Sequence, residues 1–591
     1  MPRDHTPAND SPDDAGQQPA AAQAADTADT AAGTGQQPGV GPEVGPALRE
    51  RRSVPLMSRL TAFRRGRRLG GVAAAVLLVA AGGGLVSATA LTPGGAGSSR
   101  PVAVPLAAVP AGSSVGVCPG PARLLQGAPV GTDAQFSPES ATARSDVNAL
   151  VLGSSAGVLP GSRLASLGGA TLVEIAKAPP APENPSAAPR PAAAAVPLAG
   201  VVAGYGANDV SVLSADAQAD RQPAAGAVLR YTADDGDLRG SAAAACQQPA
   251  NDLWLVGANT ALGRTAVLKI SNASSSPATV SLELFGASGA IQAPGSRGLL
   301  VAPGTTRSVV LAGLAPGQEK LSVRVRSAGG PVAAHIQQSV LRGLTPGGVE
   351  FNAPAAAPAL RQVVSGVEIQ DPAGVADLAG KAGFADAAPA LQLTVPGSTD
   401  AVIAVKVFGR DGQKALSGGG VVMAKAGSVT EVPLLGVPAG SYTVAVSSDV
   451  SFTAAARVTR GLKSEDPSDF AWSAASARLG SQHVVPVPGS GDRYLMFGAP
   501  EGRATISYTP ITADGKIRAA AVVDIAGGTT ASIRVPADIE GSPLVGYLVS
   551  AAGDPAHGAV LLQPEGKQDI ATIPIGPGAA GQEQVPVTLG Y

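Results

Sequence analysis

The fold is decided by residues 280–289, which read Val-Ser-Leu-Glu-Leu-Phe-Gly-Ala-Ser-Gly. The first five residues alternate apolar and polar side chains with the two-residue period of a half-buried β-strand. The Ser-Gly pair that follows provides the positive φ that a tight hairpin turn requires. The same alternation occurs at residues 321–326 and 403–407. We therefore expect a mainly β protein of antiparallel sheets, each with one buried and one solvated face, and one short helix or turn at residues 375–384.

The same stretch begins an internal repeat. Phe285-Gly286 and Gly289 recur 123 residues later as Phe408-Gly409 and Gly412. The register then holds without a gap for four further pairs, which are Gly304 and Gly427, Leu311 and Leu434, Gly313 and Gly436, and Gly317 and Gly440. A weaker third copy contains Ala513-Asp514-Gly515 at the turn and Gly528-Thr529-Thr530 further on. Each copy has the pattern of strand, hairpin turn, strand, Pro/Gly turn and strand.

The repeat length of about 110 to 120 residues is too long for a propeller blade and is close to that of an immunoglobulin-like sandwich. We predict three tandem antiparallel β-sandwich-like modules at residues 254–365, 366–480 and 481–591. A divergent, disulfide-closed β module is expected at residues 118–253, with a Pro/Ala-rich loop or insertion at 178–197. An alternative is one larger β architecture in which the repeats share sheets.

The N-terminal region has the pattern of a membrane anchor. Residues 1–48 contain almost no large apolar side chain, which favours a disordered tail. The basic segment 49–68 carries eight arginines and precedes an uncharged stretch at residues 69–91, which is long enough for a transmembrane helix. The positive-inside rule keeps the arginines cytoplasmic, so the tail is cytoplasmic and the rest is exported. A Pro/Gly/Ser linker is expected at residues 92–117.

Two other interpretations of the apolar stretch remain open. Ala88-Thr89-Ala90 has the A-x-A pattern of a signal-peptide cleavage site, although the 68 preceding residues exceed a normal n-region. A buried helix of a soluble protein is the other alternative, but such a helix needs no cluster of arginines before it. We favour an uncleaved signal anchor, and both membrane interpretations place the bulk of the chain outside the cytoplasm.

The two cysteines, Cys118 and Cys246, both follow the apolar stretch. In an oxidising compartment such a pair most simply forms a disulfide. No histidine lies near either cysteine in the sequence, and zinc requires three or four ligands, so a metal site is a poor alternative. We expect no cofactor and assign no catalytic, cofactor-binding or metal-binding residue.

Composition restricts the possible partners. The 591 residues include 42 Lys and Arg against 44 Asp and Glu, so the net charge is −2, and charged residues make up only 15%. Such a chain has no large single-sign field with which to bind nucleic acid. Aromatic residues are 3% of the chain, which leaves few platforms for stacking sugars or bases.

Two stretches carry a resemblance to a known family. The first is Cys118-Pro119-Gly120-Pro121. The second begins with Gly236-Asp237-Leu238-Arg239-Gly240 and continues through Ala245-Cys246, Pro249, Trp254, Gly257, Gly263-Arg264 and residues 268–272. Together they resemble the actinobacterial family known as domain of unknown function 5719, from about residue 69 to the C-terminus. The resemblance implies a membrane-anchored, extracytoplasmic protein of the cell envelope, and it implies no catalytic residues and no ligand.

Two motifs superficially suggest catalysis or calcium binding. Gly153-Ser154-Ser155-Ala156-Gly157 matches the nucleophile elbow, which needs a strand before it and a helix after it. The following Val158-Leu159-Pro160-Gly161 ends any helix at once, so we interpret the motif as a loop. Asp234-Asp235-Gly236-Asp237 lacks the spacing and the final Glu of an EF-hand, and a hairpin turn with acidic residues is the better interpretation.

The histidines and tryptophans are sparse. The four histidines are His5, His335, His483 and His557, and none of them has metal-ligand spacing. His483 and His557 are the only pair whose proximity matters for a catalytic hypothesis. Trp254 and Trp472 lie near predicted module borders. Either is a candidate sugar platform, but we interpret both as core anchors between sheets.

These features favour a non-enzymatic, single-pass scaffold or interaction protein of the cell envelope, with envelope proteins or glycans as partners. One alternative is a hydrolase that acts on an envelope glycan or ester at a site between modules. Such an enzyme requires a deep pocket with convergent polar groups. A third possibility is a transmembrane signalling element whose tail binds a cytoplasmic partner.

Overall fold

The computed structural model describes residues 106–108, 112–125, 140–154, 157–179, 198–218, 221–489, 491–579 and 584–586. The predicted tail, basic segment and transmembrane helix of residues 1–91 lie outside these ranges, as do Ser155 and most of the Pro/Ala-rich run at 178–197. Within the described ranges, no helix is long and apolar enough to cross a bilayer.

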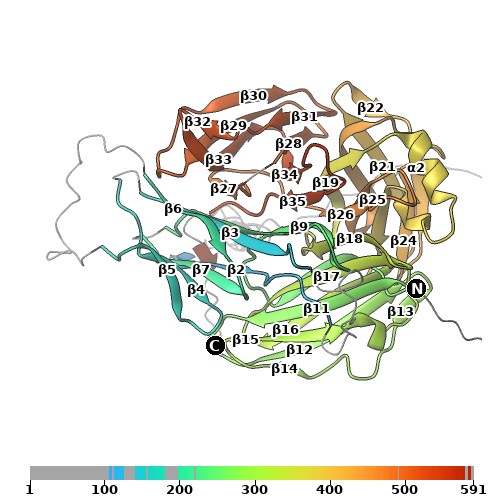
Figure 1. Ribbon diagram of the computed structural model, residues 1–591, viewed down its shortest axis with the longest axis horizontal. Helices are drawn as coiled ribbons and strands as arrows, with labels where there is room; N and C mark the ends of the chain where they lie inside the picture. The colour runs from blue at the N-terminus through green and yellow to red at the C-terminus, as the bar shows by residue number, and fades with distance from the viewer. Residues whose placement is uncertain are drawn as a thin grey trace, which may run out of the picture. The chain divides into compact units, whose positions relative to one another are not determined.

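The described chain forms four consecutive β-sandwiches, coloured from blue and cyan through green and orange to red in Figure 1. The first sandwich (residues 114–245) pairs two four-stranded antiparallel sheets. One has the order β2 (Ser114–Cys118), β7 (Ser211–Ala215), β4 (Ser162–Ser166), β5 (Thr171–Ala176). The other has the order β6 (Ala199–Gly206), β3 (Arg144–Leu152), β8 (Ala225–Ala233), β9 (Gly240–Ala245).

The second sandwich spans residues 252–352. Its first sheet has the order β10 (Asp252–Ala258), β16 (Leu321–Gly329), β12 (Ala278–Gly286), β13 (Gly289–Ile291), and β14 (Leu299–Val301) also pairs with β12. Its second sheet has the order β15 (Thr305–Val310), β11 (Arg264–Asn272), β17 (Ala333–Arg342), β18 (Thr345–Asn352). A short 3-10 helix, η2 (Leu311–Gly313), follows β15.

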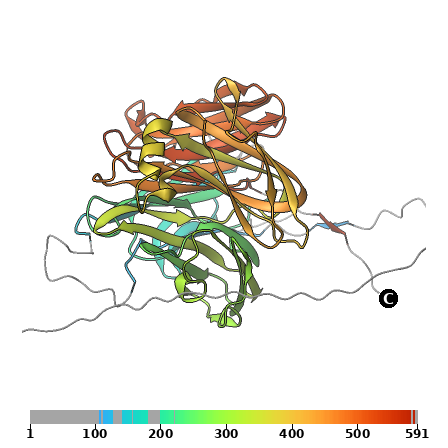
Figure 2. The same ribbon diagram turned by 90° about the vertical axis from the view of Figure 1, so that its right-hand side faces the viewer.

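The third sandwich spans residues 359–474. The long strand β25 (Gly440–Arg460) runs through both of its sheets. Its first half lies between β19 (Ala359–Ile369) and β21 (Ala401–Gly409), and β21 also pairs with β22 (Gly412–Lys414) and β23 (Val421–Ala424). Its second half lies between β20 (Ala390–Thr394) and β26 (Asp469–Ala474), and β24 (Val429–Pro433) pairs with β20. Helix α2 (Pro372–Ala379) and the 3-10 helix η3 (Ala385–Ala387) follow β19, and α2 is visible at the margin of this sandwich in Figure 2.

The fourth sandwich spans residues 483–574. One sheet has the order β27 (His483–Pro486), β33 (Ser542–Gly553), β29 (Ala504–Thr512), β30 (Ala521–Ile525), with β32 (Asp538–Ile539) paired to β33. The other has the order β31 (Thr529–Arg534), β28 (Arg493–Ala499), β34 (His557–Leu562), β35 (Ala571–Pro574). A separate two-stranded ribbon pairs β1 (Leu106–Ala108) with β36 (Gln584–Pro586).

The same strand order occurs in all four sandwiches, so the first sandwich is a fourth copy of the repeated unit. The three copies found in the sequence also share a left-handed turn before an equivalent strand. Gly304, Gly427 and Gly528 have φ values of 69°, 66° and 73° at this turn. A residue with a Cβ is strained at such angles, which explains why glycine recurs in register there.

The predicted mainly β fold is confirmed, and β12, β16 and β21 cover the three alternating stretches. Among the described strands, no sheet of the four sandwiches contains strands from two different sandwiches. The alternative in which the repeats share sheets therefore does not hold for this part of the chain. The predicted linker at 92–117 was too long, because residues 114–117 belong to β2. Their Ser, Gly and small apolar residues resemble a linker in composition, but β2 pairs with β7.

The predicted border between residues 365 and 366 falls inside β19, which pairs with β25 of the third sandwich. The short helix expected at residues 375–384 exists as α2, but it begins earlier. Pro372 occupies its first turn, and the Asp371 side chain accepts a hydrogen bond from the Gly374 N–H at 2.9 Å. This N-cap explains the earlier start.

Neighbouring sandwiches contribute to one another's cores. Val349 and Phe351 of β18 pack among the buried residues of the first sandwich. Likewise, Met496, Leu561 and Ile570 of the fourth sandwich pack in the core of the third. The final strands β9, β18, β26 and β35 lie beside one another in a closed series of contacts, and their labels gather at the middle of Figure 1. The four sandwiches are therefore interlocked along their last strands.

Asp469 lies at this meeting point and is 1% exposed. Its carboxylate accepts one backbone N–H from each sandwich, from Ser241 at 2.9 Å, Val349 at 3.2 Å, Phe470 at 3.0 Å and Ile570 at 3.1 Å. Burial, and after it the charge of Asp569, raise the pKa of Asp469 well above its ordinary value, against the opposing effect of the backbone N–H donors. Because all four partners are donors, the contacts fit the ionised carboxylate, which only accepts hydrogen bonds. We call this arrangement the Asp469 junction.

Candidate functional site

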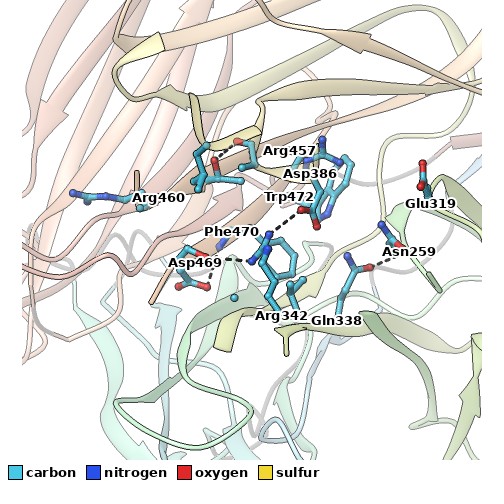
Figure 3. Close-up of a pocket in the computed structure, with 17 residues that line it drawn as sticks. Asn259, Glu319, Gln338, Arg342, Asp386, Arg457, Arg460, Asp469, Phe470 and Trp472 are labelled. Atoms are coloured by element: carbon cyan, nitrogen blue, oxygen red, sulfur yellow. Dashed lines mark hydrogen bonds and ion pairs between the residues drawn. The ribbon is translucent and has the colours of Figure 1, made fainter. Parts of the chain in front are cut away.

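A cavity of about 430 Å³ lies between the second and third sandwiches. Its walls come from the β10–β11 loop, the segment before β16, η3 and strands β24 and β25. The lining residues are Asn259, Ala261, Leu262, Arg264, Glu319, Lys320, Gly383, Ala385, Asp386, Glu431 and Arg457. A narrow inner end shares Asn259, Glu319, Asp386 and Arg457 with the cavity and reaches Trp472 and Asp469 (Figure 3). We call this site the inter-sandwich cavity.

The wall from the second sandwich is fixed by a hydrogen-bonded loop. The Gln338 side chain on β17 accepts the Asn259 N–H at 3.1 Å, and the Asn259 side chain accepts the Ala261 N–H at 2.9 Å. The Thr260 hydroxyl donates to the Ala315 carbonyl and accepts the Gln318 N–H at 2.9 Å. These bonds hold the segments around Ala261 and Gln318 together at the mouth of the cavity.

Two arginines of the second sandwich converge on Asp386 of the third. Arg264 Nε donates to Asp386 Oδ2 at 2.9 Å, and Arg342 Nη2 donates to Oδ1 at 2.8 Å. Both guanidinium groups also donate to the Gly383 carbonyl. Burial alone raises the pKa of Asp386, but Arg342 and Arg264 together lower it below its ordinary value. Asp386 therefore stays ionised and joins the two sandwiches beneath the cavity.

Arg457 and Trp472 line the inner end of the cavity. Arg457 donates from Nη2 to the Ala388 carbonyl at 3.1 Å and lies 3.4 Å from Glu431. Its guanidinium lies 5.7 Å from the centroid of the Trp472 ring. The residues are 7% and 3% exposed, yet among the described residues neither Arg457 Nε nor Trp472 Nε1 has a hydrogen-bond partner. Two buried donors at this site are thus left unsatisfied, at an expected cost of about 1–3 kcal/mol each.

Trp472 also connects the two sandwiches. Its ring packs on the backbone of Gly257 in β10, which has a φ of 99°. A Cβ at Gly257 would lie 2.5 Å from a ring atom of Trp472, so only glycine permits this approach. The tryptophan ring therefore forms a fixed base for the inner end of the cavity.

A family model described as "Family of unknown function (DUF5719)" matches residues 201–536. The chain belongs to this family. The match covers more than half of the 591 residues and runs from β6 of the first sandwich to just beyond β31 of the fourth. It confirms the resemblance to domain of unknown function 5719, and the residues of the inter-sandwich cavity lie inside the matched range. No curated protein matches the chain.

The disulfide and the acidic hairpin predicted within this family member are present. Cys118 and Cys246 are bonded, and they join the two sheets of the first sandwich. The segment 234–237 forms the hairpin between β8 and β9, with Gly236 at a φ of 73°. Asp235 accepts the Thr142 hydroxyl at 2.8 Å, and Asp234 pairs with Lys567 of the fourth sandwich at 2.6 Å. These contacts agree with an acidic hairpin turn.

Both tryptophans are core anchors, as expected, because each is 3% exposed. Trp254 stacks on Phe285 with ring centroids 5.6 Å apart, and Arg324 lies over its ring. The serine motif begins after β3, where the Gly157 N–H donates to the Ser154 carbonyl at 2.8 Å. The next regular element is the strand β4, whereas a nucleophile elbow requires a helix.

The structure separates His483 and His557 into different sheets of the fourth sandwich. His483 Nε2 accepts the Gly480 N–H at 2.7 Å, and its Nδ1 donates to the Gly576 carbonyl at 2.8 Å. His557 Nδ1 donates to the Ser476 carbonyl at 3.0 Å. In the described part of the chain, no group of three His, Cys, Asp or Glu residues is placed to hold a metal ion.

The buried His335 should make the stability of the folded protein depend on pH. Burial, and after it the charge of Lys269, lower the pKa of His335 from 6.5 to about 3. The unfolded chain therefore binds a proton below about pH 6.5 that the folded chain does not bind, so stability falls as the pH falls toward 3. Between about pH 7 and pH 4, we expect the His335→Gln variant to lose about 3 kcal/mol less unfolding free energy than the wild type. Urea denaturation at several pH values measures this difference.

Above about pH 7 the two proteins should differ by a constant amount, because the histidine is neutral in both states there. Parallel curves at all pH values would contradict the prediction and would mean that His335 accepts a proton in the folded protein.

Most of the cavity residues belong to no motif that the sequence displays. Arg264 belonged to a family motif, but Arg342, Asp386 and Arg457 were not singled out. Arg457 could have been recognised from the sequence, because it is a single charged residue in the apolar segment Ala454-Ala455-Ala456-Arg457-Val458. A charged side chain in a buried strand is expected to have a specific partner or ligand.

Proposed function

We propose that this family member is a single-pass membrane protein whose extracytoplasmic β-rich region is a non-enzymatic scaffold or interaction protein of the cell envelope. The observation that carries this proposal is the Asp469 junction, in which one carboxylate accepts a donor from each sandwich. Such a junction keeps the outer faces of four sandwiches at fixed mutual positions. A scaffold that presents several surfaces to partners needs this property.

The proposed location is supported by the sequence. Eight arginines in segment 49–68 precede the uncharged stretch 69–91, as in an anchor with a cytoplasmic N-terminus. The disulfide between Cys118 and Cys246 agrees with an oxidising compartment outside the cytoplasm. The candidate partners are therefore other envelope proteins or glycans.

Crosslinking of intact cells tests this proposal. A membrane-impermeant, amine-reactive crosslinker should reach the exposed Lys425 and Lys463 on the third sandwich and capture a discrete envelope partner. A Lys425→Arg/Lys463→Arg variant should give less of this adduct, and a Lys567→Arg variant on the fourth sandwich serves as the matched control. Adducts that form only after cell lysis would contradict the extracytoplasmic location. Complete absence of specific adducts under both conditions would contradict the scaffold role.

The inter-sandwich cavity favours one alternative, a hydrolase acting on an envelope glycan or ester. A site between modules is where that hypothesis places catalysis, and the cavity gathers several polar side chains. Asp386 suits a structural role better than acid-base catalysis, since two arginines hold it ionised. Turnover of an envelope glycan or ester that is abolished by Ser155→Ala or by substitution of His483 would establish the enzymatic alternative.

A further inference from the structure

The inter-sandwich cavity and its inner end together are lined by five positive and four negative side chains, which are Arg264, Lys320, Arg342, Arg457 and Arg460 against Glu319, Asp386, Glu431 and Asp469. Three guanidinium groups, from Arg264, Arg342 and Arg457, lie around two carboxylates, Asp386 and Glu431. The five side chains are only 8–18% exposed, so solvent screens their charges weakly. Burial lowers the pKa of Arg342, and the charges of Arg264 and Arg457 lower it further against the opposing effect of Asp386. The cluster therefore retains one uncompensated positive charge.

Two hydrogen-bond donors in the same region lack an acceptor. Arg457 Nε and Trp472 Nε1 are both buried donors without a partner in the part of the chain that the structure describes, and both residues line the inner end of the cavity (Figure 3). An acceptor that also carries negative charge would satisfy these donors and balance the charge. Carboxylate and phosphate oxygens do both, and arginine binds them in preference to neutral acceptors.

The inner and outer parts of the cavity differ in volume, so they can hold different parts of one ligand. The inner end has a volume of about 20 Å³, which is enough for one oxygen atom by the standard used for buried water. The outer part, at about 430 Å³, falls in the range of small-molecule sites. One oxygen of a ligand can thus reach the inner end while the body of the ligand occupies the outer part.

The outer walls fit a body without further charge. Ala261, Gly383 and Ala385 are small and uncharged, and Leu262 at the rim is 99% exposed. Glu319, which also reaches the inner end, and Lys320 lie at the rim, where their charges cancel. A polyanion would face Glu319 as well as the carboxylates beneath, so the site favours a single anionic group.

We propose that the inter-sandwich cavity binds a small molecule with one oxyanion group, a carboxylate or a phosphate monoester, attached to an uncharged body. This inference goes beyond the scaffold role, which requires no small ligand. A ligand placed there would contact both the second and third sandwiches and would stabilise their arrangement by mass action.

Titration calorimetry of the purified full-length chain in detergent, at constant ionic strength, tests the proposal. The probes are phenyl phosphate, benzoate and neutral benzyl alcohol, which have similar bodies. We expect one anionic probe or both to bind at least about tenfold more tightly than benzyl alcohol, because a charge-assisted hydrogen bond is lost with the neutral probe. Tighter binding of phenyl phosphate assigns the site to phosphate esters, and tighter binding of benzoate assigns it to carboxylates.

Three variants locate the binding. Arg457→Gln should weaken anion binding by about tenfold or more, and Lys320→Gln at the rim by about threefold. Glu319→Gln should strengthen it by about threefold, since it removes a like charge while keeping the shape of the side chain. Arg410→Gln makes the same charge change as Arg457→Gln at an exposed hairpin residue outside the cavity lining, and it should have no effect.

The Glu319→Gln and Lys320→Gln variants keep the test decisive if Arg457→Gln does not fold. Equal binding of benzyl alcohol and the anions, or no saturable binding of any probe, would overturn the proposal. Anion binding that is unchanged in both rim variants would also overturn it. Such a failure leaves the scaffold role unaffected if crosslinking still captures a partner.

Discussion

Replacement of Asp469 by alanine is expected to lower the free energy of unfolding by about 4 kcal/mol or more. The variant would leave the backbone N–H groups of Ser241, Val349, Phe470 and Ile570 without their acceptor in a buried place. A buried unsatisfied donor costs about 1–3 kcal/mol, and loss of one partner from a buried charged network typically costs about 3–5 kcal/mol. Urea denaturation followed by tryptophan fluorescence measures the change, since Trp472 lies three residues from the junction.

The expected consequence extends beyond the third sandwich. Because each donor comes from a different sandwich, loss of the acceptor should weaken all the contacts among the final strands. We expect limited proteolysis to cleave the Asp469→Ala variant between sandwiches at protease concentrations that leave the wild type intact. Asp466→Ala is the matched control, because Asp466 is exposed and pairs with Lys463 at the surface. A variant as stable as this control would show that the junction contributes no net stability.

Removal of the disulfide is the second change with a large expected effect. The bond joins residues 128 positions apart, and the chain-entropy model gives about 4–5 kcal/mol for a loop of this length. We therefore expect the Cys118→Ser/Cys246→Ser variant to unfold at a clearly lower urea concentration. The loss should concentrate in the first sandwich, where the bond connects β2 with the end of β9. Loss of the mobility shift on a non-reducing gel confirms that the bond is absent.

Reduction of the wild-type protein provides an independent control for this prediction. Addition of a reductant should bring the unfolding midpoint of the wild type close to that of the double variant and leave the variant unchanged. If the reduced and oxidised proteins unfold together, the first sandwich obtains its stability from its neighbours, whose Val349 and Phe351 already pack in its core.

The local features of the fold could be predicted from the sequence. The alternation at residues 280–284 predicted the strand β12, and Val280, Leu282 and Leu284 are all buried, as the pattern requires. The Gly residues at hairpins and at the turn before β15, β24 and β31 marked the repeat, because backbone geometry allows few other residues there. The first sandwich could not be recognised as a copy from its sequence, because strand order can persist after sequence register has been lost.

The cavity and the junction could not be predicted for a physical reason. Arg264 and Asp386 are 122 residues apart, and Ser241 and Asp469 are 228 residues apart. Their contacts depend on how whole sandwiches meet, and no local propensity or spacing encodes that arrangement. Asp469 itself follows a polar, Pro-containing loop and has the sequence context of an exposed turn residue. Only the convergence of four final strands buries its carboxylate and surrounds it with backbone donors.

The ribbon of β1 and β36 has a mechanical consequence. The strands are antiparallel, and Leu106, where the chain enters the ribbon, pairs with Pro586, where the chain leaves it. A force applied between the two ends of the chain would therefore pull on adjacent residues and peel the ribbon apart one hydrogen bond at a time, instead of loading all bonds together in shear. The ribbon would therefore separate under tension before the force acts on the sandwiches.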